Sequence, residues 1–520
     1  MIDIFAGPGG LGEGFSSFRP RGSSTTYPFE TAVSAEMERS AHSTLQLRSF
    51  YRLACRQQGD VPTEYWTYIR DLANGERTTP GERFSATRLD PLWKQAQAEA
   101  LNLTLGDTEH NRVLFDRIKH VRNHYDEMIL VGGPPCQAYS VVGRARQRNV
   151  QGFRTKGDPK HFLYRQYLDI LREFRPVAFI MENVKGILTS TVGNQEMFSA
   201  ILRDLADPSA ALGRQAAKNS RERYVLLPIH VPAGVERTAE LAAEDPSAFI
   251  IRCERHGIPQ ARHRVIIMGI REDAMHPRVA KVSGLFEPQD QARIEQALAG
   301  LPALRSGVSR GPDNPAAWLE TVEKERRRVI RAIKSIQPDT AEVLANMSLG
   351  YGLSRGSTRY SPGRIGALAT DLRGGSPVVL NHEARGHMAS DLARYLFCSA
   401  FAIARGRSPV RRDFPDHDVL RPSHKNWDSG VFADRFRVQM KGAPSNTITS
   451  HLSKDGHAFI HWDPEQCRSL TVREAARLQT FPDDYVFLGN RTEQFVQVGN
   501  AVPPKIAGQI ASVVWSILEG

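Results

Sequence analysis

The sequence predicts an α/β fold built on an open sheet, and three features of the chain predict it. The first is a set of short, continuous aliphatic runs, which is the pattern of strands that are buried on both faces. The second is a glycine-rich turn at residues 6–12, directly after the first of these runs. The third is a turn of glycines and prolines that follows another run and carries Cys136. Open α/β sheets bind ligands at the carboxyl ends of their strands, which is where both turns are expected.

The first predicted strand, residues 2–5, leads into a candidate ligand site. Residues 6–12 read Ala-Gly-Pro-Gly-Gly-Leu-Gly, and such a turn before a helix presents backbone N–H groups to a ligand. A second apolar stretch, residues 32–35, ends at Glu36, where this architecture places an acidic residue that bonds ribose hydroxyls. No Gly-Lys-Ser/Thr follows the glycines, which disfavours ATP. A purely structural turn is the alternative interpretation of the glycines alone.

The next predicted strand, residues 128–131, is followed by Gly-Gly-Pro-Pro-Cys-Gln-Ala-Tyr-Ser at residues 132–140. The two prolines fix φ, and the two glycines allow the backbone to approach a ligand closely. A thiol held in this way at a strand end is a candidate nucleophile. The alternative, a small buried cysteine with no chemical role, is the weaker interpretation of Cys136 because of this turn chemistry.

Two further aliphatic runs, residues 177–181 and 265–268, border polar residues that are costly to bury without a purpose. Glu182 and Asn183 follow the first run, and the segment Gln-Ala-Arg-His-Arg at residues 260–264 precedes the second. Taken singly, a helix-capping carboxylate and a surface edge explain these residues equally well.

Composition limits the possible functions. The chain has 520 residues, which allows about two to four domains. Its five cysteines form no C-x-x-C pair, which argues against zinc or disulfide frameworks and fits a reducing cytoplasm; no metal site is predicted. No apolar run approaches the roughly 20 residues that span a bilayer. The net charge of +11 favours a polyanionic partner, and residues 301–440 hold 22 Lys and Arg against 14 Asp and Glu.

Six segments, taken together, resemble the DNA cytosine-5 methyltransferases, and they occur in that family's order. They are residues 3–10 (Asp-Ile-Phe-Ala-Gly-Pro-Gly-Gly), 133–137 (Gly-Pro-Pro-Cys-Gln), 182–184 (Glu-Asn-Val), 260–264, 468–482 and 497–504. The resemblance implies S-adenosylmethionine as the cofactor. It also implies a Rossmann-like methyltransferase sheet with a smaller, loop-rich target recognition domain.

The resemblance implies a catalytic role for five residues. Cys136 would add to C6 of cytosine, so that C5 can attack the sulfonium methyl group. Glu182 would hold or protonate N3. Arg264, together with Arg262, would bind the O2 edge of the base, and Asn183 would orient the loop. Because C5 and C6 are inaccessible in a stacked base, the cytosine must be flipped out of the duplex.

The resemblance also implies a set of cofactor contacts. Phe5 and Leu163 would flank the adenine, the glycines would line the methionine portion, Glu36 would bond the ribose, and Asn500 would close the site. The full set is Phe5, Gly7, Gly9, Gly10, Leu11, Glu36, Pro134, Leu163 and Asn500. An acidic residue after the third strand should contact the adenine amino group, for which Asp107 is the first candidate and Asp60 is the alternative.

The predicted organisation has three parts. Residues 1–275 form the catalytic and cofactor-binding domain, with a helical insertion of unknown use at about 45–124. Residues 276–440 form the target recognition domain. Residues 441–520 return to complete the catalytic domain and place the last helix beside the first strand. The first motif begins at Asp3, which leaves few residues for the first strand and makes a start further upstream an alternative.

The leading hypothesis is a sequence-specific DNA cytosine-5 methyltransferase of a restriction-modification or related system. The expected partners are double-stranded DNA and a cognate restriction endonuclease, and the expected state is a monomer in the bacterial cytoplasm, at the nucleoid. One alternative is a tRNA cytosine-5 methyltransferase, but the basic region of roughly 165 residues favours duplex DNA. Another is a non-catalytic DNA-binding regulator, although Cys136, Glu182 and Arg264 are all retained.

Overall fold

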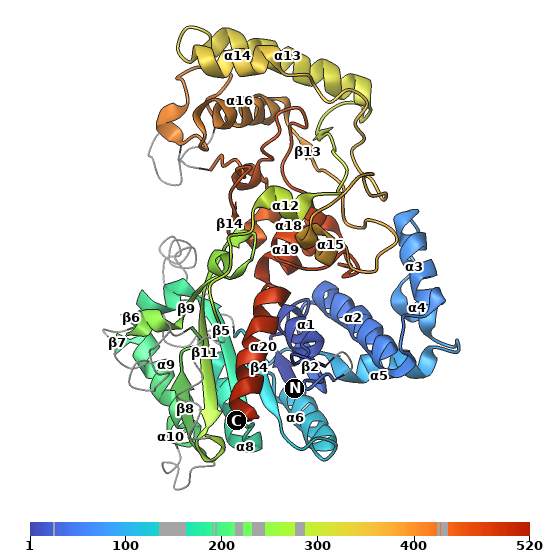
Figure 1. Cartoon of the computed structure of the whole chain (residues 1–520), viewed down its shortest axis with the longest axis vertical. Coiled ribbons are helices and arrows are strands. Elements are labelled where there is room, and N and C mark those ends of the chain that lie inside the picture. Colours follow the sequence, from blue (N-terminus) through green and yellow to red (C-terminus); the bar gives the residue numbers. More distant parts are fainter. Residues whose placement is uncertain are drawn as a thin grey trace.

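The computed structural model has an α/β layer at one end and a mainly helical part at the other (Figure 1). The structure describes residues 1–23, 26–134, 163–189, 191–192, 195–213, 222–230, 245–275, 286–423, 427 and 435–519, without the side chains of residues 191–197. The predicted nucleophile Cys136 therefore lies outside the described residues. Gly133 and Pro134, which begin its turn, lie inside them.

The central sheet has the strand order β3-β2-β1-β4-β5-β11-β8, and β9 pairs with β11. The strands are β1 (Ile2–Ile4), β2 (Val33–Glu36), β3 (Ala100–Asn102), β4 (Ile129–Gly132), β5 (Ala178–Val184), β8 (Tyr224–Leu227), β9 (Ile250–Arg252) and β11 (His263–Arg271). Strands β1 to β5 run parallel, whereas β11 is antiparallel to its neighbours. The chain leaves β1 for β2 on one side and returns as β4 on the other, which creates a ligand-binding switch point between their carboxyl ends.

The aliphatic runs of the sequence form these strands, and the α/β prediction is confirmed. Residues 2–5, 128–131, 177–181 and 265–268 lie in or at the edge of β1, β4, β5 and β11. Their aliphatic side chains are almost completely buried because helices cover both faces of the sheet. This double coverage is the physical reason why the runs are continuous and do not alternate with polar residues.

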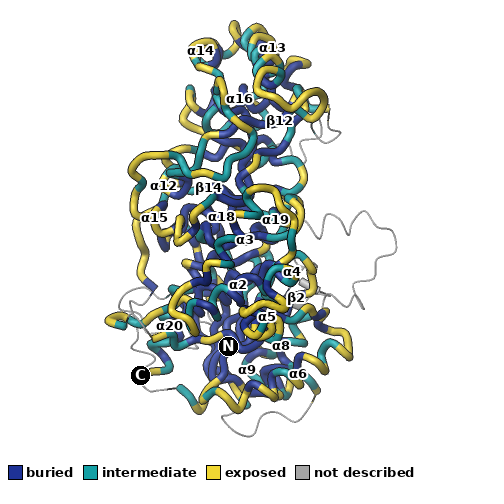
Figure 2. The backbone as a smooth tube through the Cα atoms, turned by 90° about the vertical axis from the view of Figure 1, so that its right-hand side faces the viewer, coloured by how far each residue is buried: buried dark blue, intermediate teal, exposed yellow. Residues whose placement is uncertain are grey.

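Two groups of helices cover the sheet, and Figure 2 shows the buried layer between them. On one face, α1 (Gly10–Ser17) packs against α20 (Pro504–Leu518) over a core that includes Phe15 and Val131. On the other face lie α6 (Thr108–Arg122), α8 (Leu163–Phe174) and α9 (Met197–Ala206). The C-terminal helix thus packs directly on the helix that follows the glycine-rich turn.

One described segment, Arg491–Leu518, is long and apolar enough to cross a membrane by length and composition. It consists of α19 (Arg491–Asn500) and α20, which are separate helices. Of its apolar window, 61% is buried inside the protein, and the apolar side chains of α20 belong to the core against α1. These side chains are therefore accounted for by packing within the chain.

Extra helices lie beside the sheet edge formed by β2 and β3. After α2 (Arg39–Gln58) come α3 (Thr63–Ala73), α4 (Pro80–Phe84) and α5 (Asp90–Glu99), which share one aromatic core. Of the other elements in residues 45–124, β3 belongs to the sheet and α6 to its covering layer, and the insertion itself stays a prediction. The added helices are α3, α4 and α5.

The upper part of the molecule contains more helix than the loop-rich prediction. Helices α13 (Pro315–Ile333), α14 (Pro338–Asn346) and α16 (Ala389–Arg405) pack together around Trp318 and Phe397. Residues beyond 440, among them Ile460 and Cys467, share this core. Between the two parts lies a third cluster with α12 (Ile294–Leu298), α15 (Ala367–Arg373), α18 (Val472–Leu478) and α19.

Candidate active site

The glycine-rich turn is packed tightly on one side and open on the other. The backbone takes positive φ at Phe5 (55°), Gly7 (59°) and Gly9 (100°), and positive φ is costly for a phenylalanine. A Cβ at Gly10 would lie 2.1 Å from the carbonyl oxygen of Val502, whereas a Cβ at Gly7 would meet no atom within 4 Å. The open side at Gly7 is where a ligand can approach the backbone.

Glu36 is fixed against this turn at the end of β2. One oxygen of its carboxylate accepts a hydrogen bond from the Gly7 amide (2.8 Å), and the other accepts one from the Glu38 amide (2.8 Å). The side chain is buried, and this burial raises the pKa of Glu36 above its ordinary value. A carboxylate oriented by two backbone amides keeps lone pairs for hydroxyl donors of a ligand.

Asp107 and Leu163 lie at the neighbouring loop ends, and Asp60 does not. Asp107 follows β3 and caps α6 by accepting hydrogen bonds from the amides of Glu109 and His110 (3.0 Å each). Next to it, a Cβ on Gly106 would lie 3.6 Å from Leu163. Asp60 is in the loop between α2 and α3, in the added helices. Of the two acidic candidates, Asp107 is the one that follows a strand of the central sheet.

An ion pair stands at the end of β5, beside the start of the turn that carries Cys136. The Arg264 guanidinium, from β11, lies 2.9 Å from the Glu182 carboxylate, and both side chains are about one-eighth exposed (13% and 12%). The two residues are diagonal neighbours on antiparallel strands. A Cβ at Gly133 would lie 2.9 Å from the other Glu182 oxygen, so only glycine lets this turn pass so close to the carboxylate.

Asn183 ties the same turn to β5. Its side-chain amide donates a hydrogen bond to the carbonyl of Pro134 (3.2 Å), and its oxygen accepts one from the Val184 amide (2.8 Å). Asn183 is 3% exposed. The amide side chain therefore fixes the position of the turn relative to β5.

Arg262 is buried, and its guanidinium bonds to backbone carbonyls of the C-terminal segments. It is 1% exposed and donates hydrogen bonds to the carbonyls of Ile448 (2.8 Å), Gly499 (3.3 Å) and Ala501 (2.8 Å). Burial lowers the pKa of Arg262 to about 9. These hydrogen bonds join the C-terminal segments to the sheet, and the contact of Arg262 with the base stays a prediction.

Leu11 and Asn500 have opposite side-chain surroundings, and their predicted cofactor contacts stay predictions. The Leu11 side chain is packed in the core under α20, so only its backbone amide, in the first turn of α1, is available to a ligand. Asn500 ends α19 with an exposed side chain. The residues after it, Ala501 and Val502, are the ones that pack on Arg262 and Gly10.

Sequence reasoning missed several residues that hold the glycine-rich turn from behind. Tyr485 donates a hydrogen bond from its hydroxyl to the carbonyl of Pro8, and Arg48 bonds Glu13 in the first turn of α1. Asp3 is 1% exposed, and burial raises its pKa to about 7. Tyr485 lies three residues after the recognised segment 468–482, so its proximity to that segment was the available signal.

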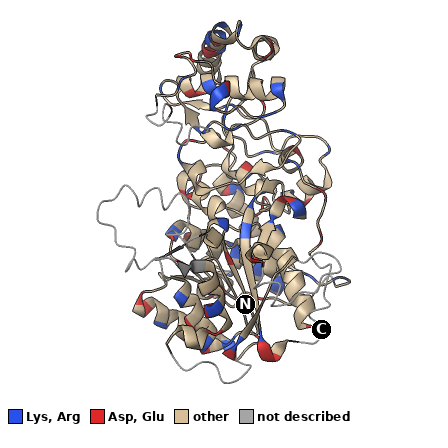
Figure 3. Cartoon of the chain, turned by 90° about the vertical axis from the view of Figure 1, so that its left-hand side faces the viewer, with Lys and Arg blue, Asp and Glu red and all other residues tan. Residues whose placement is uncertain are grey.

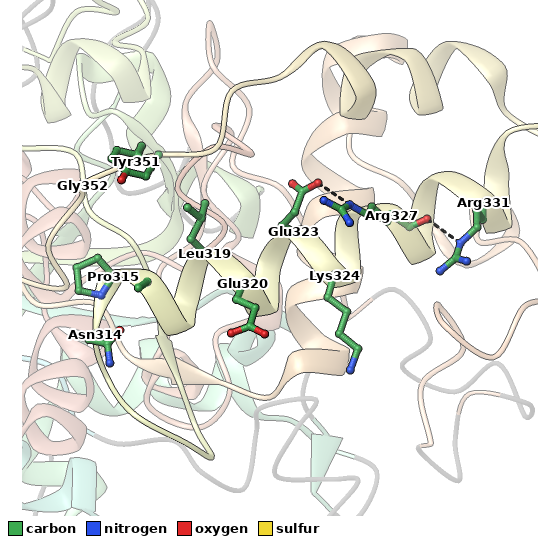
Figure 4. A pocket seen from close by; sticks show the side chains of 12 residues that line it. Asn314, Pro315, Leu319, Glu320, Glu323, Lys324, Arg327, Arg331, Tyr351 and Gly352 are labelled. Carbon is green, nitrogen blue, oxygen red and sulfur yellow. Dashed lines mark hydrogen bonds and ion pairs between the residues drawn. The ribbon is translucent and has the colours of Figure 1, made fainter.

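Basic residues are spread over the molecule, and one cavity lies in its upper part. Figure 3 shows Lys and Arg over both parts of the molecule. A cavity of about 1030 Å³ runs along α13 and is lined by Leu319, Lys324, Arg327 and Tyr351 among others (Figure 4). It is remote in the fold from the carboxyl ends of β1, β4 and β5, so it is not the candidate active site.

The fold and the site define a class of enzyme. A parallel sheet with a ligand-binding turn after β1 and an acid at the end of β2 is the frame of a nucleotide-type cofactor site. A carboxylate–guanidinium pair beside a Gly-Pro-Pro turn adds a reaction centre next to it. The chain belongs to the family of C-5 cytosine-specific DNA methylases, whose model matches residues 93–208 and 246–515. The protein is a DNA cytosine-5 methyltransferase.

Individual relatives agree with this family. The chain is 30% identical over 530 residues to a type II methyltransferase of Bacillus paralicheniformis, covering 100% of this chain and 99% of the relative. It is 28% identical over 412 residues to a type II methyltransferase of Thalassovita gelatinovora, covering 74% and 82%. A crystal structure of a putative DNA modification methyltransferase from an Escherichia coli prophage has the same fold, with a TM-score of 0.52 at 17% identity and coverage of 100% and 99%.

Proposed function

We propose that the enzyme transfers a methyl group from S-adenosylmethionine to C5 of a flipped-out cytosine in a specific duplex sequence. The observation that carries this proposal is the Glu182–Arg264 pair, which lies against Gly133 at the start of the cysteine turn. The cofactor, when bound, supplies an electrophilic methyl group. The turn fits it, because Gly7 leaves its side open and Glu36 is held with free lone pairs beside it.

The chain's own residues would carry the remaining chemistry. The Cys136 thiolate adds to C6 of the cytosine, and a nearby guanidinium such as that of Arg264 favours the thiolate form. Glu182 holds or protonates N3, which draws electrons from the ring as the thiolate adds. This addition would make C5 nucleophilic, so that it could accept the methyl group that the cofactor would supply. Loss of the C5 proton and elimination of Cys136 then restore the aromatic ring.

Arg264 would orient this reaction without exchanging a proton. Its guanidinium already pairs with one Glu182 oxygen, and it presents further N–H donors in a fixed plane. A base seated in the site would place its O2 edge on these donors. Asn183 would keep the cysteine turn at the right distance through its bond to Pro134.

The substrate class follows from the need to extrude the base. Flipping a cytosine costs a few kcal/mol, which contacts elsewhere on the duplex must offset. The net charge of +11 supplies long-range attraction to phosphates. The names of the relatives, which are type II methyltransferases, support duplex DNA over tRNA and a role in a restriction-modification system. We also propose that the enzyme is a monomer, that it acts beside a cognate endonuclease, and that it is located in the cytoplasm at the nucleoid.

Methylation of unmethylated genomic DNA, mapped by bisulfite sequencing, tests this function. The purified protein with S-adenosylmethionine should produce methylcytosine in one short sequence, and Cys136→Ser should abolish it while leaving DNA binding in place. Methylation of tRNA alone would move the substrate to RNA. Specific DNA binding without any methylation, under conditions in which the cofactor binds, would favour the regulator instead.

A further inference from the structure

Three consecutive residues after α18, Asp483, Asp484 and Tyr485, bond to three separate parts of the fold. All three are buried, with 0%, 7% and 0% exposure. They lie next to a motif, but no catalytic or cofactor role has been assigned to them above. Their side chains point in different directions, so this short segment links elements that are far apart in the sequence.

Tyr485 supports the glycine-rich turn from its packed side. Its hydroxyl donates to the carbonyl of Pro8, within the turn. A Cβ on the neighbouring Gly9 would lie 2.8 Å from the same hydroxyl and 2.7 Å from Leu45. Burial raises the pKa of Tyr485 far above its ordinary value, so the hydroxyl remains a donor over the whole working range. The turn is therefore pressed against Tyr485, opposite its open face at Gly7.

Asp484 acts on the same turn through Arg48 of α2. The Arg48 guanidinium donates to Asp484 (3.0 Å) and to Glu13 (2.9 Å), which lies in the first turn of α1. It also lies over the ring of Tyr485, at 4.8 Å from the ring centre. Tyr51 donates to the second Asp484 oxygen (3.0 Å). Asp484, Arg48 and Glu13 thus fix the start of α1, where the turn ends.

Asp483 faces the other way, toward the part of the molecule that holds α15 and α18. It accepts two hydrogen bonds from Arg477 of α18 (2.9 and 2.6 Å) and one from the Tyr360 hydroxyl (2.8 Å). Its amide donates to the carbonyl of Leu372 in α15 (2.7 Å). The position of residues 484 and 485 is therefore set by contacts with that part.

We propose that Tyr485, Asp484 and Arg48 are positioning residues of the cofactor-binding turn, which they hold in its ligand-ready shape. The inference rests on the proposed function, because it takes residues 6–12 as the S-adenosylmethionine site. None of the three side chains touches the open face of the turn at Gly7, so they act through the backbone of Pro8 and through Glu13. Their loss should weaken cofactor binding without removing a group that reacts.

The test compares Tyr485→Phe with a matched control, Tyr224→Phe, in the full chain. Tyr224 is also a buried tyrosine that donates to a proline carbonyl, that of Pro176 (3.0 Å), at the far edge of the sheet. Calorimetric titration with S-adenosylmethionine should give a dissociation constant about three- to tenfold higher for Tyr485→Phe, the range expected for one buried hydrogen bond. The control should bind like the wild type. In steady-state assays, KM for the cofactor should rise in Tyr485→Phe while kcat at saturating cofactor stays within about twofold.

A second readout needs no cofactor. Hydrogen exchange of the amides of residues 6–13 should become faster in Tyr485→Phe and in Asp484→Asn, and should stay unchanged in Tyr224→Phe. Equal cofactor affinity and equal exchange in Tyr485→Phe and the wild type would overturn the inference, as would an equal loss in the control. Asp484→Asn, which keeps its volume, takes the place of Tyr485→Phe if that variant does not fold. If the folded wild type binds no S-adenosylmethionine, the proposed function fails, and this inference fails with it.

Discussion

Arg262 and Arg264 lie two residues apart in one motif but have different surroundings. Arg264 is in β11, beside Glu182 at the open end of the sheet. Arg262 precedes that strand and points into the protein, where backbone carbonyls surround its guanidinium. A buried guanidinium is stable only if its donors are satisfied. Arg262 therefore has backbone carbonyls as partners and Arg264 has a carboxylate, even though both are arginines of the same segment.

This separation gives a prediction at the residue scale. Arg262→Met leaves the buried carbonyls of Ile448 and Gly499 without this donor and weakens the bonding of Ala501, so it should lower the free energy of unfolding by about 3 kcal/mol. Arg264→Met should instead reduce kcat by about 100-fold or more, the usual effect of removing a preorganised donor at a reaction centre. Urea unfolding and steady-state methylation of the same two proteins measure both effects. If the Arg262→Met protein is as stable as the wild type but has a strongly reduced kcat, the result would support a contact between Arg262 and the base.

At the scale of elements, the junction between the two parts depends on buried histidines and ion pairs around α18. His382 lies between the carbonyl of Pro302 and the hydroxyl of Thr471, which caps α18 (3.0 and 2.9 Å). Nε2 must donate to the carbonyl, so the neutral ring accepts at Nδ1. Arg468 forms a buried ion pair with Glu474 in the same cap, at 2.7 Å. The two hydrogen bonds of His382 at this junction therefore require its neutral ring.

Acidification should weaken this junction. Burial lowers the pKa of His382 to about 4, below its ordinary 6.5, so the unfolded chain takes up the proton first as the pH falls. Its stabilising contribution is complete above pH 6.5 and is lost progressively as the pH falls to 4. At pH 5 the loss from this residue should be about 2 kcal/mol. Urea midpoints of the wild type and His382→Gln between pH 7 and 4.5 measure it, and parallel curves for the two proteins would contradict it.

At the scale of the whole molecule, the added helices support a segment that comes from the upper part. Residues 374–381 run over α3, and Leu380 joins the aromatic core of α2, α3 and α5. Gly375 faces Trp66, with its Cβ position 3.7 Å from the ring. Figure 1 shows this segment descending beside α3. The added helices α3, α4 and α5 are thus a platform on which residues 374–381 pack.

Removing the Phe50 ring from the centre of this platform should destabilise both α3 to α5 and residues 374–381. Phe50 is fully buried and stacks on Phe84 at 4.4 Å between ring centres. Phe50→Ala should cost about 3–5 kcal/mol locally, and hydrogen exchange should accelerate in α3 to α5 and in residues 374–381. Phe397→Ala, at an equally buried site in the other core, is the control and should leave both segments protected. Faster exchange in α3 to α5 alone would show that the platform does not support residues 374–381.

The sequence by itself determined the features that depend on local patterns. Apolar runs identified β1, β4, β5 and β11, because a strand buried on both faces is apolar at nearly every position, with Asp3 of β1 as the exception. Short motifs identified the family, because glycines and a proline pair are required wherever backbone must approach a ligand. Glu182 and Arg264 could be named in advance only through the family's motifs, because each of them taken singly has an equally good structural explanation.

Only the tertiary structure decided how distant residues satisfy one another. The partners of Arg262 lie between 186 and 239 residues away along the chain, and Tyr485 reaches Pro8 across 477 residues. The extent of the added helices and the helical core of the upper part likewise depended on what packs against them. A buried polar or charged group is stabilised by whichever partner the fold brings to it. Neither the composition nor the periodicity around such a residue identifies that partner.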